Sequence, residues 1–249
     1  MVALAQPERK ETNKHRLALL VLLAGLEHQY KVLVQRHTAE MMGGLLRLAD
    51  ADGKIPTTRL NAVRMVIRSG MVLLASRVAT DFNQAVIPAA HYGVELAGGG
   101  AGQYAEAQRS AADMIERGAL GVAFVAVAAN AIAQATNNFT GAVTRAIVSG
   151  EPLKTAQVEI DHAAEMLTKK ISGQATLNLN AAFVAATRAT AGSTNIARLV
   201  WRIFPALESH CVLCLSRDGN EYPIDDPVWD DLPAHNHCGC WGEPVEETP

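Results

Sequence analysis

The sequence predicts a mainly α-helical protein, in which an elongated multi-helix domain precedes a small zinc-stapled β-hairpin element at the C-terminus. Two observations carry this prediction. Hydrophobic residues make up 49% of the 249-residue chain but aromatic residues only 5%, so alanine and glycine must supply much of the packing, which favours closely packed helices. All four cysteines fall within residues 211–240, in two clusters with the spacing of a small metal-binding element.

The chain begins with polar residues 1–13, which we expect to form a flexible N-terminal arm before a helical domain at 14–175. The apolar run at 17–26 follows Lys14 and Arg16 and resembles a signal peptide. It has no small-x-small cleavage site, and a run of about ten residues is shorter than the roughly 20 that span a bilayer. We therefore predict a buried core helix at 13–48, with a cleaved signal peptide as the alternative.

Further helices follow from apolar periodicity and from the positions of proline and glycine. Pro56 opens one helix, Pro88 interrupts another, and Gly118 and Gly173 each end one. The glycine-rich residues 98–102 lack the lysine and the preceding strand of a phosphate loop, so they are expected to form a flexible joint. The expected helices are 56–79, 81–96, 104–117, a fully buried central helix at 119–135, an amphipathic helix at 153–171, and a last long helix at 176–204.

Charge is distributed unevenly along the chain, which indicates two surfaces with different partners. Residues 1–80 carry twelve Lys/Arg against six Asp/Glu, whereas residues 205–249 carry one against ten. Arginines of the last helix are expected either to pair with the acidic tail or to face solvent. Candidate partner-binding residues are Arg59, Arg64 and Arg68 on the basic side, and Asp225, Asp226, Asp230 and Asp231 on the acidic side.

The C-terminal domain at 176–249 ends in a cysteine-rich tail, in which a Cys-x-x-Cys pair precedes a Cys-x-Cys pair. An Asp-Gly turn signal between the pairs allows the chain to fold back and bring them together. Four soft ligands suit a tetrahedral Zn²⁺, which would stabilise so short a segment. The candidate metal ligands are Cys211, Cys214, His235, Cys238 and Cys240, with His237 as a further competitor for the four positions.

Three other roles for the cysteines stay open. They could form two disulfides, although no secretory signal indicates an oxidising compartment. A redox-active Cys-x-x-Cys normally belongs to a βαβ pattern, which the sequence does not contain. A nucleophilic cysteine could use His210 or His237 as its base.

The order of the C-terminal motifs resembles the C-terminal domain of the phage head morphogenesis family typified by phage Mu protein F. The resemblance runs from about Asn180 to Pro244. In this family Arg usually lies between the last two cysteines, where this chain has Gly239. The residues that carry the resemblance are Cys211-x-x-Cys214, Asp218-Gly219, Tyr222-Pro223, Pro233-Ala234-His235 and Cys238-Gly239-Cys240, with Arg188, Arg198 and Trp201 expected in the preceding helix.

The resemblance implies a minor structural virion protein that binds the portal inside the phage head and assists head assembly, DNA packaging or DNA ejection. It implies several copies in each particle, located in the head interior after assembly in the host cytoplasm. Besides the portal protein, the major capsid or scaffold protein and packaged DNA are candidate partners, and a membrane is not an expected one. The implied protein is not an enzyme, and its zinc is structural.

Two alternatives belong to other functional classes. A Cys-dependent hydrolase or transferase domain would need a nucleophile paired with a base, and no such pairing occurs at a family-like spacing. A DNA-binding protein would use the basic N-terminal third of the chain, and its binding would weaken steeply with salt.

Overall fold

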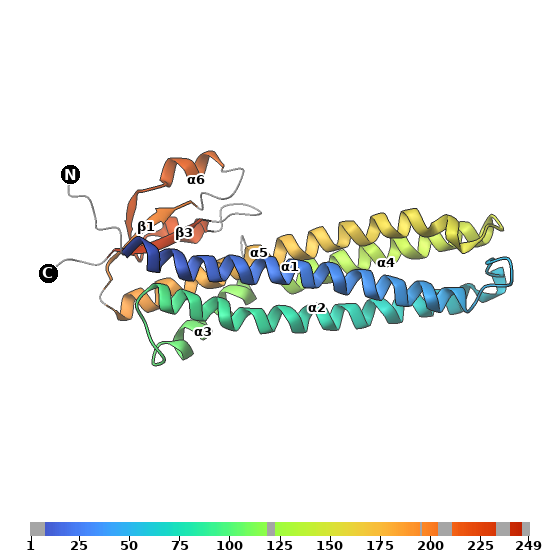
Figure 1. Ribbon diagram of the computed structural model, residues 1–249, viewed down its shortest axis with the longest axis horizontal. Coiled ribbons are helices and arrows are strands. Elements are labelled where there is room, and N and C mark those ends of the chain that lie inside the picture. The colour runs from blue at the N-terminus through green and yellow to red at the C-terminus, as the bar shows by residue number, and fades with distance from the viewer. Residues whose placement is uncertain (1–7, 119–122, 195, 204–210, 233–239, 246–249) are drawn as a thin grey trace. The chain divides into compact units, whose positions relative to one another are not determined.

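The computed structural model describes residues 8–118, 123–194, 196–203, 211–232 and 240–245 of the chain, with side chains from residue 14 onward. Within these ranges the protein is mainly helical and carries a small antiparallel β-sheet near its C-terminus, which confirms the coarse prediction. Figure 1 shows the elements in chain order by colour. The α-helices are α1 (Glu8–Leu46), α2 (Leu60–Leu96), α3 (Tyr104–Arg117), α4 (Phe124–Val148), α5 (Gln157–Ser193) and α6 (Val212–Arg217).

Three short 3-10 helices and three strands complete the described elements. The 3-10 helices are Thr57–Arg59, Leu153–Ala156 and Pro227–Asp231. The strands are β1 (Arg198–Arg202), β2 (Glu221–Pro223) and β3 (Trp241–Val245). They form one sheet in the order β2-β1-β3, in which β1 pairs antiparallel with both neighbours.

The chain divides into two compact units, and the long helices contribute segments to both. Unit 1 contains Met1–Gly25, Phe82–Phe124 and Gly173–Pro249, whereas unit 2 contains Leu26–Asp81 and Val125–Ser172. The domain boundary predicted between residues 175 and 176 falls inside α5. That division of the sequence stays a prediction, as does the flexibility of the arm, of which residues 1–7 lie outside the described residues.

Unit 2 is held by close packing of α1 on α2 and by a contact between two loops. A Cβ atom added at Gly70 would come within 2.4 Å of the Met41 side chain, so the two helices approach closely at this point. The Tyr30 hydroxyl donates a hydrogen bond to the carbonyl of Val78 at 3.3 Å. The Leu153 amide donates to the carbonyl of Gly53 at 2.9 Å, which joins the loop after α1 to the loop after α4.

Unit 1 is organised around the C-terminal half of α5. Residues 175–187 of this helix are buried on nearly all sides, the pattern of a helix enclosed in a core. At Gly93 of α2 an added Cβ would come within 2.5 Å of the Phe183 carbonyl oxygen, so only glycine allows this approach. Small residues surround the contact, since Ala90, Ala182 and Ala186 are completely buried.

The predicted central helix was therefore assigned to the wrong segment. In α4, which covers part of residues 119–135, buried positions alternate with exposed ones, and Val125 is exposed. The segment 119–135 is apolar because the exposed face of α4 also carries small residues. The C-terminal half of α5 is enclosed because other parts of unit 1 pack against nearly all of its sides. Residues 119–122 lie outside the described residues.

Two predicted helix breaks are also wrong, because tertiary packing outweighs local preference. α2 continues through Pro88, next to the fully buried Ala89 and Ala90, although an interior proline costs about 3 kcal/mol. α5 continues through Gly173, where a glycine costs only about 1 kcal/mol and buried residues lie on both sides. By contrast, the predicted limits of α3 and its end at Gly118, with φ of 80°, are confirmed.

The last predicted helix, 176–204, ends at Ser193, and Arg198–Arg202 is a strand rather than a helix. Leu199, Val200 and Trp201 are buried in β1, and aliphatic and aromatic side chains of this kind favour strands. The expected two-stranded hairpin is consequently a three-stranded sheet whose central strand precedes both cysteine clusters.

One described helical segment, Lys14–Leu46 of α1, is long and apolar enough to cross a membrane by length and composition alone. Core helices pass the same test. In α1 the buried residues recur at spacings of three and four, through Leu19, Leu23, Leu26 and Tyr30. This is the pattern of a helix with one face in a protein core, as the sequence predicted.

The close approach at Gly93 leads to a stability prediction. Gly93→Ala should lower the free energy of unfolding by about 1–3 kcal/mol, because the new methyl group would overlap the Phe183 carbonyl. Gly43→Ala is the matched control, since no atom lies within 4 Å of its added Cβ and alanine is the better helix former by about 0.5–1 kcal/mol. Urea denaturation checks both variants, and equal stability of the two would contradict the packing described here.

Candidate metal centre

The first cysteine cluster lies at the N-terminus of α6. Cys211 is the N-cap residue, and its Sγ accepts a hydrogen bond from the Cys214 amide at 3.3 Å. The two Sγ atoms are 3.2 Å apart, with Cys214 buried and Cys211 partly exposed. This turn therefore holds the two sulfurs close together.

Cys240, the last residue of the second cluster, lies next to the sheet, beside the C-terminal end of β1. Cys240 immediately precedes β3, whose first residue Trp241 pairs with Arg202 of β1. On the other side, the amide of the next residue, Ile203, donates to Oδ1 of Asp218 at 3.0 Å, and Asp218 ends α6. The fold therefore brings α6 and Cys240 to the same end of the sheet.

The donor set was tested against a tetrahedral zinc site. Two sulfurs bound to zinc at about 2.3 Å lie about 3.8 Å apart, so Cys211 and Cys214 need only a small separation to act as a pair of ligands. They are too far apart for a mutual disulfide, with its S–S bond of about 2.05 Å. Among the residues that the structure describes, no three His, Cys, Asp or Glu side chains form a group able to hold a metal. His235, His237 and Cys238 lie outside the described residues.

A fully buried arginine connects the second cluster to the helices of unit 1. The Arg16 Nη1 of α1 donates to Oδ1 of Asn180 in α5 at 2.6 Å. The Asn180 Nδ2 donates in turn to the carbonyl oxygen of Cys240 at 3.2 Å. The guanidinium also lies over the rings of Phe183 and Trp241, 5.5 Å and 5.4 Å from their centroids, in cation–π geometry.

The sheet carries an aromatic core of its own. Trp201 stacks on Trp229 with ring centroids 5.7 Å apart, and Tyr222 meets Trp229 edge to face at 5.8 Å. The Trp229 indole donates to the carbonyl of Pro223 at 2.7 Å. Arg217 covers the outer face of Trp201 at 5.0 Å and pairs with Asp231 at 2.8 Å. The short cysteine-rich segment therefore packs on an aromatic core, in addition to any stability that a metal would supply.

Most of the predicted acidic surface is engaged within the protein. Arg188 of α5 pairs with Asp230 at 2.9 Å and donates from Nε to the carbonyl of Ile224 at 3.0 Å. Asp226 caps the 3-10 helix Pro227–Asp231 by accepting from the Val228 amide at 2.8 Å. Asp225 is exposed.

Of the two alternatives for the arginines of the last predicted helix, the structure shows pairing with the acidic tail. In addition to the Arg188 pair, Arg198 lies 3.4 Å from Glu221, and Arg202 pairs with Glu243. The acidic charge counted in the sequence is thus partly neutralised by the arginines that precede it. The surface of the C-terminal element is less negative than its sequence suggests.

The predicted basic residues lie on unit 2. The Arg59 Nη1 donates to the carbonyl of Leu48 at 2.8 Å, so this side chain holds the loop after α1. Arg64 and Arg68 are exposed on α2. For the hydrolase alternative, His210 and His237 both lie outside the described residues, so the pairing of a nucleophile with a base stays a hypothesis.

Sequence reasoning missed Arg16, Asn180 and the stacked tryptophans. A signal for Arg16 was present, because it continues the three-and-four spacing of the buried residues Leu19 and Leu23. An arginine in the core-facing register of a helix indicates a buried cation that needs partners. For the aromatic core, the signal was that all three tryptophans of the chain, at 201, 229 and 241, fall in its last fifty residues.

The chain matches no family model, no curated protein and no solved structure. The likeness of its C-terminal motifs to phage head morphogenesis proteins therefore depends on the residues themselves and stays a prediction.

Replacement of the buried arginine provides a test of this site. Arg16→Ala should lower the free energy of unfolding by about 2–4 kcal/mol. The substitution removes the contacts with the Phe183 and Trp241 rings and the hydrogen bond that Arg16 donates to Oδ1 of Asn180. Arg109→Ala is the matched control, since Arg109 is exposed on α3 and bonds only within its own helix in the described contacts. A loss below about 0.5 kcal/mol for Arg16→Ala, the range of ordinary surface substitutions, would contradict the buried role.

Proposed function

We propose that this chain is a minor structural protein of a phage head, which binds the portal and assists head assembly, DNA packaging or DNA ejection. Its C-terminal motifs support this proposal by their resemblance to phage head morphogenesis proteins. The structural observation that carries it is the pair of cysteine sulfurs, 3.2 Å apart on a capped helix N-terminus, in an element fixed to the helices by a buried arginine. Such an element suits assembly because it presents a rigid surface.

In this proposal a structural Zn²⁺ is bound by Cys211 and Cys214, with two further ligands from His235, His237, Cys238 and Cys240. When bound, the metal supplies a cross-link between the two clusters and fixes the chain that connects them. The residues of this chain supply the remaining rigidity, through the stacked Trp201 and Trp229 and the arginine–carboxylate pairs.

The docking surface for the portal is assigned to the C-terminal element, and the multi-helix part, elongated in this proposal, supports it. Exposed carboxylates such as Asp225 suit a basic surface on the partner. The protein acts in the head interior after assembly in the host cytoplasm, in several copies per particle. Major capsid or scaffold protein and packaged DNA are its further candidate partners.

The metal content of the purified full chain tests the zinc part of the proposal. Protein prepared under reducing conditions with Zn²⁺ should retain about one zinc per chain, and chelation should lower its thermal midpoint. Cys214→Ser should lose most of the metal, whereas Ser216→Ala, on the exposed side of the same helix, should keep it. Elemental analysis provides the measurement, and a metal-free protein with an unchanged midpoint would rule out the structural zinc.

Binding to assembled portal rings tests the assembly role separately. The full chain should co-sediment with rings of the portal protein from the same virion, and Asp225→Lys should weaken this binding about tenfold by reversing a charge at the interface. Asp113→Lys makes the same change on α3 and should bind as the unmodified chain does. If the unmodified chain does not co-sediment with the rings, the portal-binding function is wrong, whatever the metal content.

A further inference from the structure

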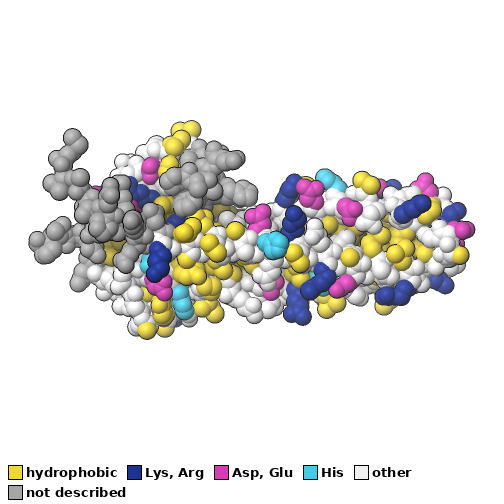
Figure 2. All heavy atoms as spheres, in the orientation of Figure 1, with side chains coloured by type: hydrophobic (Ala, Val, Ile, Leu, Met, Phe, Trp, Pro, Cys, Tyr) yellow, Lys and Arg dark blue, Asp and Glu magenta, His cyan; other side chains and the backbone are white. Residues whose placement is uncertain are grey.

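The short helix α6 exposes three aliphatic side chains, Val212, Leu213 and Leu215, which we call the apolar knob. Val212 is 83% exposed, the highest exposure among the large hydrophobic side chains of the described residues. The knob faces outward because Cys214, between its members, faces inward and is buried. Figure 2 shows hydrophobic side chains at the outer tip of the region where Figure 1 draws α6.

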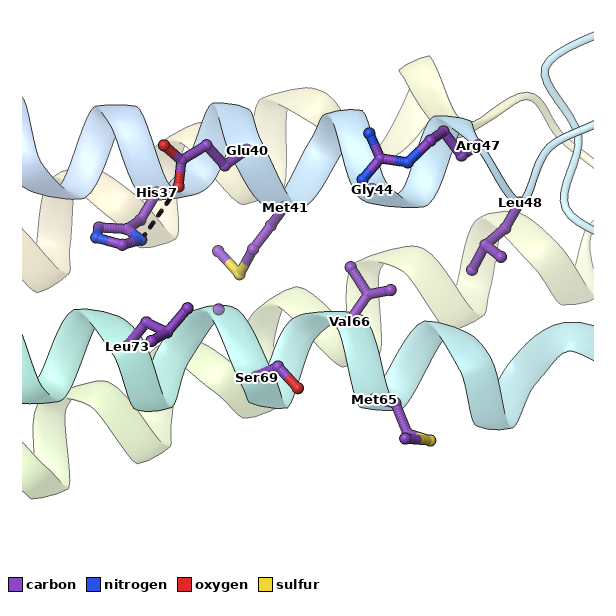
Figure 3. Close-up of a pocket in the computed structure, with 11 residues that line it drawn as sticks. His37, Glu40, Met41, Gly44, Arg47, Leu48, Met65, Val66, Ser69 and Leu73 are labelled. Atoms are coloured by element: carbon purple, nitrogen blue, oxygen red, sulfur yellow. Dashed lines mark ion pairs between the residues drawn. The ribbon is translucent and has the colours of Figure 1, made fainter.

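Unit 2 carries a complementary hollow, the apolar groove, between α1 and α2. Its volume is about 470 Å³. Figure 3 shows Met41 of α1 and Leu48, in the turn after α1, pointing toward α2, and Val66 of α2 pointing toward α1. Leu73 lines the groove and is exposed, so the groove is open to an apolar group from outside.

Glycines keep the groove open along its length. A Cβ added at Gly44 would come within 2.9 Å of Val66, and one added at Gly70 would overlap Met41. Both glycines line the groove, so their missing side chains leave apolar walls accessible where a larger residue would fill the space. A groove of this size, with mainly apolar walls and a polar part formed by His37, Glu40, Arg47 and Ser69, has the character of a binding site for a small number of side chains.

The knob and the groove lie on segments of opposite charge. Residues 26–81, which contain the groove, carry eight Lys/Arg against five Asp/Glu, and the groove itself is lined by one of each, Arg47 and Glu40. The described residues 198–203, 211–232 and 240–245, which contain the knob, carry three Lys/Arg against seven Asp/Glu, and the exposed Asp218 directly ends α6. Opposite charges around two apolar surfaces favour their association, and they favour contact of a knob with a groove over contact between two like surfaces.

We propose that the apolar knob of one copy of this chain docks in the apolar groove of a second copy. One chain carries both halves, with matching apolar character and opposite charge, which is why a second copy is the chosen occupant. Such a contact joins two different surfaces, and a pair held by one contact still has one free knob and one free groove, so it either closes into a reciprocal dimer or grows further. This inference goes beyond portal binding and does not depend on it.

Complementation between two variants of the full chain tests the proposal. Val212→Asp removes the knob and Leu73→Asp removes the groove, and each variant alone should be monomeric, with association weakened at least about tenfold. Mixed together, the two variants should form a 1:1 dimer and nothing larger, because only one functional knob and one functional groove remain. Analytical ultracentrifugation gives the masses, and circular dichroism confirms that both variants keep their helices.

The unmodified chain, of 26.5 kDa, should form dimers or larger species at concentrations on the order of 10–100 μM, and salt should weaken them. Val158→Asp is the matched control and should associate as the unmodified chain does, because Val158 is 78% exposed and, like Val212, lies in the first turn of its helix. A chain that stays monomeric over this range, or a mixture of variants that stays monomeric, would overturn the proposal. Association of Leu73→Asp alone would also overturn it.

Discussion

The guanidinium of Arg16 is the constraint on which the arrangement of unit 1 depends. A fully buried cation loses several kcal/mol of hydration, so it persists only where partners replace that hydration. Its partners come from distant parts of the chain: Asn180 and Phe183 of α5, and Trp241 of β3. Asn180 extends the connection to the backbone of Cys240. The first helix, the enclosed helix and the cysteine-rich element must therefore be in place together.

Local sequence signals predicted the helical class and the limits of α3, and they failed where packing outweighed them. Pro88 and Gly173 were expected to end helices, but buried neighbours on both sides carry α2 and α5 through them. The last predicted helix extends to residue 204 and so includes the strand β1, although Leu199, Val200 and Trp201 are typical strand residues. Enclosure of α5 depends on its neighbours, which a single segment cannot reveal.

Only the first cysteine cluster of the candidate metal site, Cys211 and Cys214, could be predicted from the sequence and then located in the structure. Cys-x-x-Cys spacing predicts two sulfurs on one turn, and the structure brings Cys211 and Cys214 together, whereas His235 and Cys238 lie outside the described residues. Charge counted along the sequence overstated the acidic surface, because arginines distant in sequence pair with it, as Arg188 does with Asp230. The aromatic core supplies stability that the sequence reasoning assigned to metal alone, so zinc in this proposal cross-links an element that already packs.

Hydrogen exchange of the full chain, with and without a zinc chelator, tests most directly whether a metal-dependent element is joined to α1 through Arg16. Chelation should lower the protection of amides in residues 211–232 and β1, and also in residues 14–25 of α1, while Leu26–Asp81 keeps its protection. Protection that is unchanged throughout, or that falls only in residues 211–232, would contradict this account.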